Sequence, residues 1–279
     1  MRSFQILRDQ FQKYIGKNAI DSLSNEILKN KEKAMPMVLI SGNQFTGKST
    51  MAKNLSSYYQ GGGFYSVGQM FRELAQTLGI SVGEQSRLLR IIQEGKLHEQ
   101  SDALKKLQGK RVDIELDYRT CQLISGHNWI PEQKYIVIEG RQPAIMGTFV
   151  EGLGKKDLYR IYLKCSAKEQ ALRFIQREIG ESEFKIAQEH LSKLKNVNTI
   201  DGNSNEEENI GSFLNEISKL PLENINDIVS KFIENQNRDQ DDRKRYNDLY
   251  HLDYEDMSYY DLIIDTSSDS STNKSASLI

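Results

Sequence analysis

Five short apolar runs recur along the chain, and longer stretches with helical spacing separate them. The runs are rich in β-branched and aromatic residues, which favour strands. They lie at Met37–Ser41, Phe64–Val67, Tyr135–Glu139, Leu158–Lys164 and Leu262–Asp265. Nearly continuous apolar strands that alternate with helices are typical of a parallel sheet covered on both faces. With right-handed crossovers, the pattern predicts an α/β fold of three layers around a five-stranded parallel sheet.

Two regions lie outside this alternation. The first 34 residues begin with MRSFQILRDQFQKYIGK, whose spacing predicts an amphipathic helical extension. The second region runs from about Glu181 to Asn237, and its middle, Asn196–Ile210, is rich in Asn, Glu, Gly and Ser. We expect a flexible loop there and helix again at Phe213–Leu220 and Ile225–Ile233. The polar residues 269–279 predict a disordered tail.

Composition narrows the class of protein. The 279 residues can bury a substantial core, and the formal net charge of −2 does not favour a strongly cationic nucleic-acid binder. No apolar run approaches the roughly 20 residues that span a bilayer. Two distant cysteines and four scattered histidines lack metal-ligand spacing, so we expect reduced thiols and no zinc. These features predict a cytoplasmic monomer that acts on a small molecule, with no membrane or nucleic-acid partner.

The first apolar run leads directly into a glycine-rich motif. After Val38–Ser41 the chain reads G-x-x-x-x-G-K-S, and a helical pattern follows at Met51–Tyr59. Strand, motif and helix in this order predict a phosphate-binding loop for ATP with Mg²⁺. Glycine permits close backbone approach, and the helix N-terminus attracts anions. The residues expected to bind the cofactor are Gly42, Asn43, Gln44, Phe45, Thr46, Gly47, Lys48, Ser49 and Thr50.

Two further roles follow from this motif. We expect Lys48 to be catalytic, with its ammonium between the β- and γ-phosphates, and the Ser49 hydroxyl to be a magnesium ligand. A third candidate is Glu139, which stands at the carboxyl end of the apolar run at 135–139. An acid at that place can hold magnesium or its waters, and the alternative is an ordinary carboxylate at the end of a strand.

Arginines, and not a carboxylate base, follow the other strands. A hydroxyl acceptor usually needs a base, whereas a phosphate acceptor needs cations to offset its charge. Arg238, Asp242 and Arg245 have the spacing of one helix face. Each arginine alone is better explained as a solvated helix face. Together they favour a nucleoside monophosphate as the acceptor; the arginines are Arg72, Arg141, Arg173, Arg177, Arg238 and Arg245.

These motifs resemble the cytidylate kinases, especially the compact archaeal-type branch of this nucleoside monophosphate kinase family. The resemblance covers about residues 38–178 and 238–267. Besides the phosphate loop it rests on three segments: Tyr65–Ala75, Glu139–Arg141, and a long closing pattern from Arg245-Tyr246 through Tyr250, Asp253 and Asp256 to Tyr260-Asp261-Leu262. The resemblance implies a kinase domain at 35–268, an acceptor-binding helical segment at about 68–125, and an enlarged lid with an insertion at about 178–238.

The resemblance also implies residue roles. Arg72, Arg141, Arg238 and Arg245 would hold the acceptor phosphate, and Asp242 would contact the ribose hydroxyls. Arg173 and Arg177 would be catalytic, on the lid side, by stabilising the transferring phosphoryl group. Asp265–Ser267 would lie near the adenine, and Asp113 and Asp117 are weaker candidates in the acceptor-covering helices.

One departure from the family concerns the base. The bacterial-type pattern has an acid after the Gly-Arg pair that helps to read cytosine, and this chain has Gln142 there. An amide can both donate and accept hydrogen bonds, so Gln142 is the candidate for pairing with cytosine in CMP or dCMP. Two alternatives stay open: a kinase of another small acceptor, and a regulatory nucleotide-binding protein without turnover. We also expect that Val197–Pro221 buries little and can be replaced by a short linker without loss of the fold.

Overall fold

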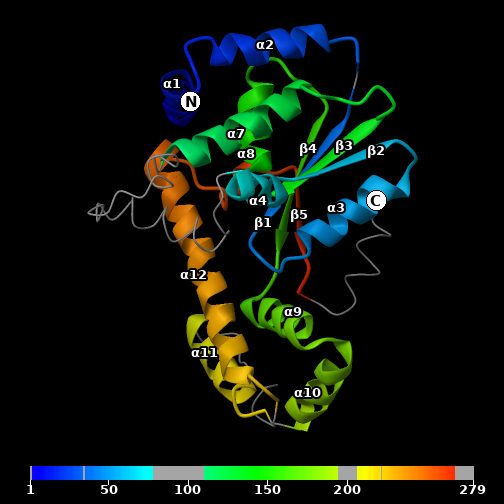
Figure 1. Ribbon diagram of the computed structural model, residues 1–279, viewed down its shortest axis with the longest axis vertical. Coiled ribbons are helices and arrows are strands. Elements are labelled where there is room, and N and C mark those ends of the chain that lie inside the picture. The colour runs from blue at the N-terminus through cyan, green and yellow to red at the C-terminus, as the bar shows by residue number, and fades with distance from the viewer. Residues whose placement is uncertain (1, 34, 78–109, 194–205, 221, 268–279) are drawn as a thin grey trace. The chain divides into compact units, whose positions relative to one another are not determined.

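The structure is a computed structural model (Figure 1). It describes residues 2–33, 35–77, 110–193, 206–220 and 222–267. The described residues form two compact units. The first draws on Met1–Gly42, Lys48–Tyr162 and Arg243–Ile263, and the second on Asn43–Gly47, Leu163–Asp242 and Ile264–Ile279, apart from the residues that are not described. No helix among the described residues is both long and apolar enough to span a membrane.

The predicted five-stranded parallel sheet is confirmed. Its strands run in the order β2-β3-β1-β4-β5, and β1 pairs in parallel with β3 in the register Leu39 with Ile138. Every strand begins and ends within two residues of the run that predicted it. The strands are β1 Met37–Gly42, β2 Gly62–Ser66, β3 Tyr135–Gly140, β4 Leu158–Lys164 and β5 Leu262–Asp265.

Side chains along β1 alternate between the two faces of the sheet, and helices pack against the sheet. Met37 and Leu39 belong to the main hydrophobic core together with Ile145 of α8 (Pro143–Glu151). Helix α8 packs against β1 and β3, and α7 (Lys110–Ser125) packs against α8. Helices α3 (Lys48–Tyr58) and α4 (Val67–Thr77) also pack on the sheet, α3 against β1, β2 and β3. Because successive strand residues point to opposite faces, this packing gives the predicted layered α/β architecture.

The N-terminal extension is part of the main core. It forms α1 (Arg2–Tyr14) and α2 (Ala19–Lys29), and both helices pack against α7. Leu7 and Phe11 are fully buried, and the Phe11 ring lies edge-on to Tyr118 at 5.3 Å between centroids. Residues 1–34 lie outside the predicted alternation of strands and helices, but the apolar faces of α1 and α2 join the main core beside α7.

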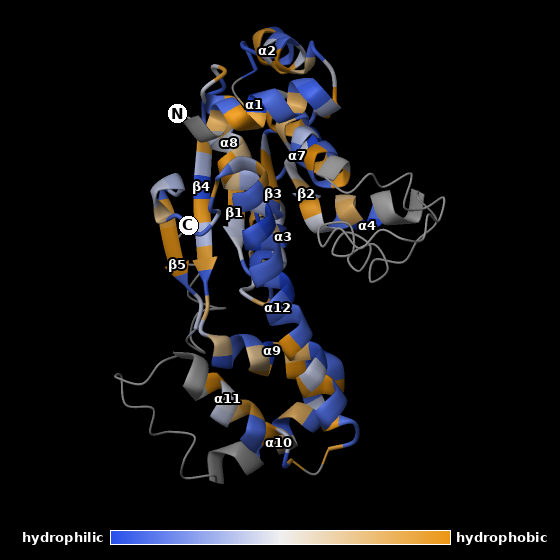
Figure 2. Ribbon diagram, turned by 90° about the vertical axis from the view of Figure 1, so that its left-hand side faces the viewer, coloured by the Kyte–Doolittle hydropathy of each residue, from blue (hydrophilic) through white to orange (hydrophobic). Residues whose placement is uncertain are grey.

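The second unit has a hydrophobic core of its own. Its helices are α9 (Ala167–Ile179), α10 (Glu181–Lys193), α11 (Glu206–Ile217) and the first part of α12 (Ile225–Tyr250). Apolar side chains from all four pack together, and Figure 2 shows the apolar residues distributed along these helices. Helix α9 begins at a capping serine, since the Ser166 hydroxyl accepts a hydrogen bond from the backbone N–H of Glu169 at 3.3 Å.

The expectation that Val197–Pro221 buries little is wrong for its second half. Phe213, Leu214, Ile217 and Leu220 are all buried in the core of the second unit. Phe213, Leu214 and Ile217 lie on one face of α11, and Leu220 follows the helix, so this segment contributes to the core. The loop expected at Asn196–Ile210 is wrong for residues 206–210, which belong to α11. Its remainder and the tail expected at 269–279 lie outside the described residues.

Candidate functional site

The glycine-rich loop connects β1 to α3, as its motif predicts. Gly47 has φ 89° and Phe45 has φ 59°, both in the left-handed region that favours glycine. Helix α3 begins at Lys48, so Lys48, Ser49 and Thr50 form its first turn, where backbone N–H groups have no partner within the helix. A left-handed turn that ends at a helix N-terminus is well suited to bind an anion.

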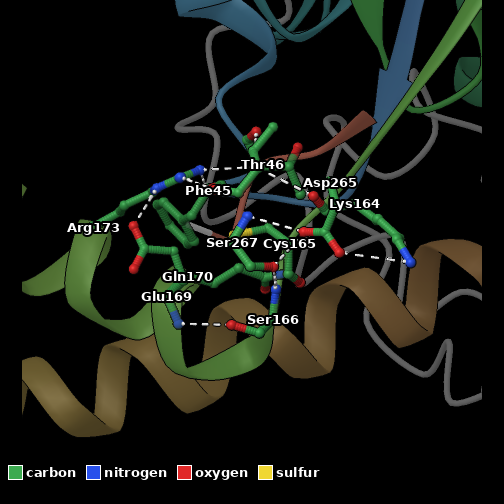
Figure 3. Close-up of polar contacts among 11 residues, drawn as sticks. Phe45, Thr46, Lys164, Cys165, Ser166, Glu169, Gln170, Arg173, Asp265 and Ser267 are labelled. Carbon is green, nitrogen blue, oxygen red and sulfur yellow. Dashed lines mark hydrogen bonds and ion pairs between the residues drawn. The ribbon is translucent and has the colours of Figure 1, made fainter. Parts of the chain in front are cut away.

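Arg173 braces this loop within the second unit (Figure 3). Its Nη1 donates to the carbonyl oxygen of Phe45 at 3.2 Å and to Oγ1 of Thr266 at 3.1 Å, and its Nη2 donates to the carbonyl of Thr266. Glu169, one turn earlier on α9, accepts from Nε at 3.0 Å. These contacts orient the guanidinium toward the loop backbone. Stabilisation of a transferring phosphoryl group by Arg173 stays a prediction.

Thr266, just after β5, makes a second link to the loop. Its hydroxyl donates to the carbonyl of Thr46 at 3.0 Å, and the Thr46 hydroxyl donates to the carbonyl of Asn43 at 2.9 Å. The loop carbonyl groups of Asn43, Phe45 and Thr46 thus accept hydrogen bonds from side chains. The segment expected near the adenine, Asp265–Ser267, thus contacts the loop through Thr266.

Arg177 lies one turn beyond Arg173 and is 60% exposed. Its guanidinium carbon lies 4.9 Å from the ring centroid of Phe45 and 5.1 Å from that of Phe174, and it pairs with Glu178 at 3.0 Å. Cation–π contact holds the side chain beside a residue of the loop while its polar end stays accessible. Contact of Arg177 with a transferring phosphoryl group stays a prediction.

Helix α12 supplies further contacts to the loop that the sequence reasoning missed. The backbone N–H of Gln44 donates to Oδ2 of Asp239 at 3.0 Å, and its Nε2 donates to the carbonyl of Asn235 at 3.1 Å. Asp239 and the predicted Asp242 are both buried, and the predicted Arg238 is half-buried. Partial burial of Arg238, Asp242 and Arg245 fits the shared helix face that their spacing predicts.

Two strand ends of the first unit bring Glu139 and Ser66 together. Glu139 is buried at the end of β3, and the hydroxyl of Ser66, the last residue of β2, donates to its Oε1. Register explains the contact, because Ser66 stands opposite Glu139 in the parallel ladder. Among the described residues no group of three or more His, Cys, Asp or Glu side chains could hold a metal ion. Magnesium binding by Ser49 and Glu139 stays a prediction.

A buried polar cluster joins α7, α8 and α12 in the first unit. Asp117 accepts hydrogen bonds from Nε2 of Gln142 at 3.1 Å, from the hydroxyl of Tyr250 at 2.8 Å and from that of Tyr246. One turn earlier on α7, Asp113 pairs with Nε of Arg245 at 3.0 Å. Two predicted acceptor residues, Gln142 and Arg245, and the two weaker candidates are thus brought together.

Burial changes the acid–base chemistry of this cluster. The pKa of Asp117 is raised from 3.8 to about 7, chiefly by burial and also by the nearby charge of Asp113, while the hydrogen bonds from Tyr246, Tyr250 and Gln142 act in the opposite direction. Burial also raises the pKa values of the Tyr246 and Tyr250 hydroxyls, which stay protonated donors. The Cys121 thiol has a raised pKa for the same reason and is inert.

Arg141 and Arg72 are the other predicted acceptor residues of the first unit. Arg141 follows β3 directly and is half-buried, whereas Arg72 on α4 is exposed and, among the described residues, lies outside the cluster. Much of the acceptor-binding segment expected at 68–125 falls on residues 78–109, which are outside the described residues. Tyr246 and Tyr250 were part of the family pattern but had no assigned role. Their spacing of four residues could have placed both on one helix face.

Sequence comparison with known proteins agrees with the family resemblance that the motifs indicate. No protein-family model matches the chain. The cytidylate kinase of Methanocaldococcus jannaschii is 26% identical over 232 residues, which cover 83% of this chain and 88% of that protein. The cytidylate kinase of Thermococcus kodakarensis is 25% identical over 232 residues, 82% of this chain and 79% of that protein. That of Pyrococcus abyssi is 26% identical over 236 residues, 83% and 84% of the two chains.

The chain is similar in sequence to archaeal cytidylate kinases. The matches to cytidylate kinases extend over most of both sequences, so they include more than the phosphate loop. Among solved structures, an uncharacterized protein from Eubacterium ventriosum aligns over 88% of this chain and 98% of that one, with 12% identity and a TM-score of 0.43. Shikimate kinase from Acinetobacter baumannii, in complex with shikimate, aligns over 89% and 93% with 12% identity and a TM-score of 0.37. Similarity of this degree carries no argument about the present chain.

Proposed function

We propose that the protein is an ATP-dependent nucleoside monophosphate kinase that phosphorylates CMP and dCMP to CDP and dCDP. The observation that carries the proposal is the similarity to enzymes named cytidylate kinase over about 83% of the chain. That span is long enough to include both the phosphate loop and the acceptor cluster. In this proposal the protein works as a cytoplasmic monomer on small-molecule nucleotides.

The residues of the loop fit ATP. Left-handed backbone at Phe45 and Gly47 and the start of α3 at Lys48 suit a polyphosphate, which needs N–H donors and a positive helix end. Lys48 would place its ammonium on the β- and γ-phosphates, and Ser49 and Glu139 would hold Mg²⁺ or its waters. When bound, Mg²⁺ would neutralise part of the charge on the nucleotide phosphates.

The acceptor side is supported by the chemistry of the first unit. An acceptor phosphate is already an anion, so it needs arginines and no general base. Arg141 at the end of β3 and Arg245 on α12 are half-buried, where a guanidinium contacts phosphate with less solvent screening. Arg72 and Arg238 would complete the phosphate contacts, and Asp242 would accept from the ribose hydroxyls.

Transfer itself would depend on position and charge. Lys48, Arg173 and Arg177 would stabilise the negative charge that develops on the moving phosphoryl group. In the structure the guanidinium of Arg173 is hydrogen-bonded to Phe45, Thr266 and Glu169, so Arg173 would also hold the loop in its conformation. Arg177 has the accessible end that can reach a phosphate. We further propose that the helices at about 178–238 form the enlarged lid of the kinase domain at 35–268.

An acceptor panel tests the proposal. Wild-type protein would be assayed with ATP and Mg²⁺ by coupled detection of ADP, with CMP, dCMP, UMP, AMP and a non-nucleotide alcohol as acceptors. The proposal predicts the highest kcat/KM for CMP or dCMP. Preference for the alcohol would identify a different small-molecule kinase. ATP binding without transfer to any acceptor would identify a nucleotide-binding protein without turnover.

A further inference from the structure

Gln142 is held by the backbone around it. It is the residue before α8, its carbonyl accepts from the backbone N–H of Met146 at 3.1 Å, and Pro143 begins the helix. The hydroxyl of Ser41 on β1 accepts from the N–H of Ala144 at 3.3 Å, which attaches the start of α8 to the sheet. The side chain of Gln142 is 4% exposed in a fixed frame, so the remaining freedom is the orientation of its amide.

Asp117 removes that freedom. Its Oδ1 accepts from Nε2 of Gln142, and the hydroxyls of Tyr246 and Tyr250 donate to the same carboxyl group. An ionised carboxylate has no proton to donate, so it can face only the N–H₂ side of a carboxamide. The carbonyl oxygen Oε1 of Gln142 must then point away from Asp117. In the part of the chain that the structure describes, the hydrogen bond recorded for this amide is the one from Nε2 to Asp117, at 3.1 Å.

We infer that Asp117 is a positioning residue that fixes the amide of Gln142 with Oε1 toward the acceptor base, so that the site selects a base with an exocyclic amino group. The inference rests on the proposed function. Cytosine presents an amino group where uracil presents a carbonyl oxygen. Oε1 can accept a hydrogen bond from the amino group of cytosine. Opposite the carbonyl oxygen of uracil, both atoms are acceptors, so neither forms a hydrogen bond.

The charge state of Asp117 sets the conditions of the test. The titratable groups that face its carboxyl are Asp113 and Cys121 on its own helix and Tyr246 and Tyr250 on α12, and Arg245 of α12 pairs with Asp113. Because the pKa of Asp117 is about 7, the acid is ionised at pH 8. The experiment is therefore performed at pH 8, where the carboxylate can only accept.

The decisive variant is Asp117→Asn, which keeps the shape of the side chain. Asparagine can present either its oxygen or its nitrogen to Gln142, so the amide of Gln142 is free to turn over. The ratio of kcat/KM for CMP to that for UMP should fall by at least about tenfold in this variant. Thr120→Val is the matched control. Thr120 is buried on the same helix and donates only to its own helix, to the carbonyl of Leu116 at 2.9 Å, so the ratio should be unchanged.

A second variant keeps the test decisive if Asp117→Asn does not fold, as judged by circular dichroism. Gln142→Met replaces the amide by an apolar group of similar length, and it should bring the CMP to UMP ratio close to that of Asp117→Asn. A ratio unchanged from wild type in either folded variant would overturn the inference and leave the kinase assignment standing. Absence of transfer to every nucleoside monophosphate by wild-type protein would overturn the proposed function and the inference together.

Discussion

At the scale of single residues, three buried acids among the described residues of the first unit each face identified donors. Glu139 accepts from Ser66, Asp113 pairs with Arg245, and Asp117 accepts from three side chains. Burial of a carboxyl group is unfavourable unless such partners replace water. For Asp117 the partners do not fully offset the loss of solvent, since its pKa remains raised to about 7. The protonation of this buried acid therefore depends on pH near neutrality.

This link predicts a pH dependence of stability. Between about pH 4 and pH 7 the folded chain keeps a proton on Asp117, with its pKa of about 7, that the unfolded chain has released. Unfolding then becomes easier as pH rises through this window, by on the order of 4 kcal/mol from this group. Asp117→Asn should remove that contribution. Urea denaturation of both proteins at pH 4.5 and pH 8 measures it, and parallel changes in the free energy of unfolding would contradict the raised pKa.

Arg141 supplies a prediction about the acceptor. Arg141→Ala should lower kcat/KM for CMP by about tenfold to a hundredfold, since a charge-assisted hydrogen bond to phosphate is lost. Arg72→Ala should act in the same direction. Affinity for ATP, measured by titration calorimetry without acceptor, should change little in both variants. Loss of ATP affinity with normal acceptor kinetics would show that these arginines serve the other nucleotide.

At the scale of elements, strands were more predictable than the packing of helices. Continuous apolar runs such as Tyr135–Glu139 fit a buried strand of a parallel sheet, so residue type alone was enough to predict where the strands lie. The burial of α1 and α2 could not be derived in the same way, because an amphipathic helix shows which face is apolar but not what covers it. The cluster around Asp117 was also missed, since it forms only when α7, α8 and α12 meet.

Helix α11 offers a direct correction to test. Ile217 is fully buried in the core of the second unit, so Ile217→Ala should lower the free energy of unfolding by about 2–5 kcal/mol. Asn215→Ala is the matched control, because that residue is on the same helix and exposed. Thermal melting of the two variants distinguishes them. Equal melting temperatures would restore the view that this segment is dispensable.

The hydrogen bonds from Arg173 to the phosphate loop predict that replacing Arg173 by lysine impairs ATP binding even though the charge is kept. Arg173→Lys keeps the charge but cannot reach Phe45, Thr266 and Glu169 at once, so KM for ATP should rise by about tenfold. Arg119→Lys is the control: Arg119 also pairs with a glutamate one turn earlier on its helix, Glu115, but it is exposed on α7. Steady-state kinetics with ATP varied measures the difference. An unchanged KM in Arg173→Lys would mean that the brace does not shape the loop.

At the scale of the whole molecule, the residues of the proposed reaction come from both units. Lys48, Glu139, Arg141 and Arg245 belong to the first unit, whereas Phe45, Arg173, Arg177 and Asp242 belong to the second. The chain passes from one unit to the other inside the phosphate loop and inside α12.

The central claim is that the γ-phosphoryl group of ATP passes to the phosphate of CMP. Phosphorus-31 NMR of wild-type protein with ATP, Mg²⁺ and CMP follows that transfer atom by atom. The account predicts that the CMP signal is replaced by the two signals of CDP while ATP becomes ADP in equal amount. With Lys48→Ala, the spectrum should stay close to that of the starting mixture, because charge stabilisation of the moving group is lost. A wild-type spectrum in which CMP is unchanged, or ATP yields only ADP and free phosphate, would contradict the account.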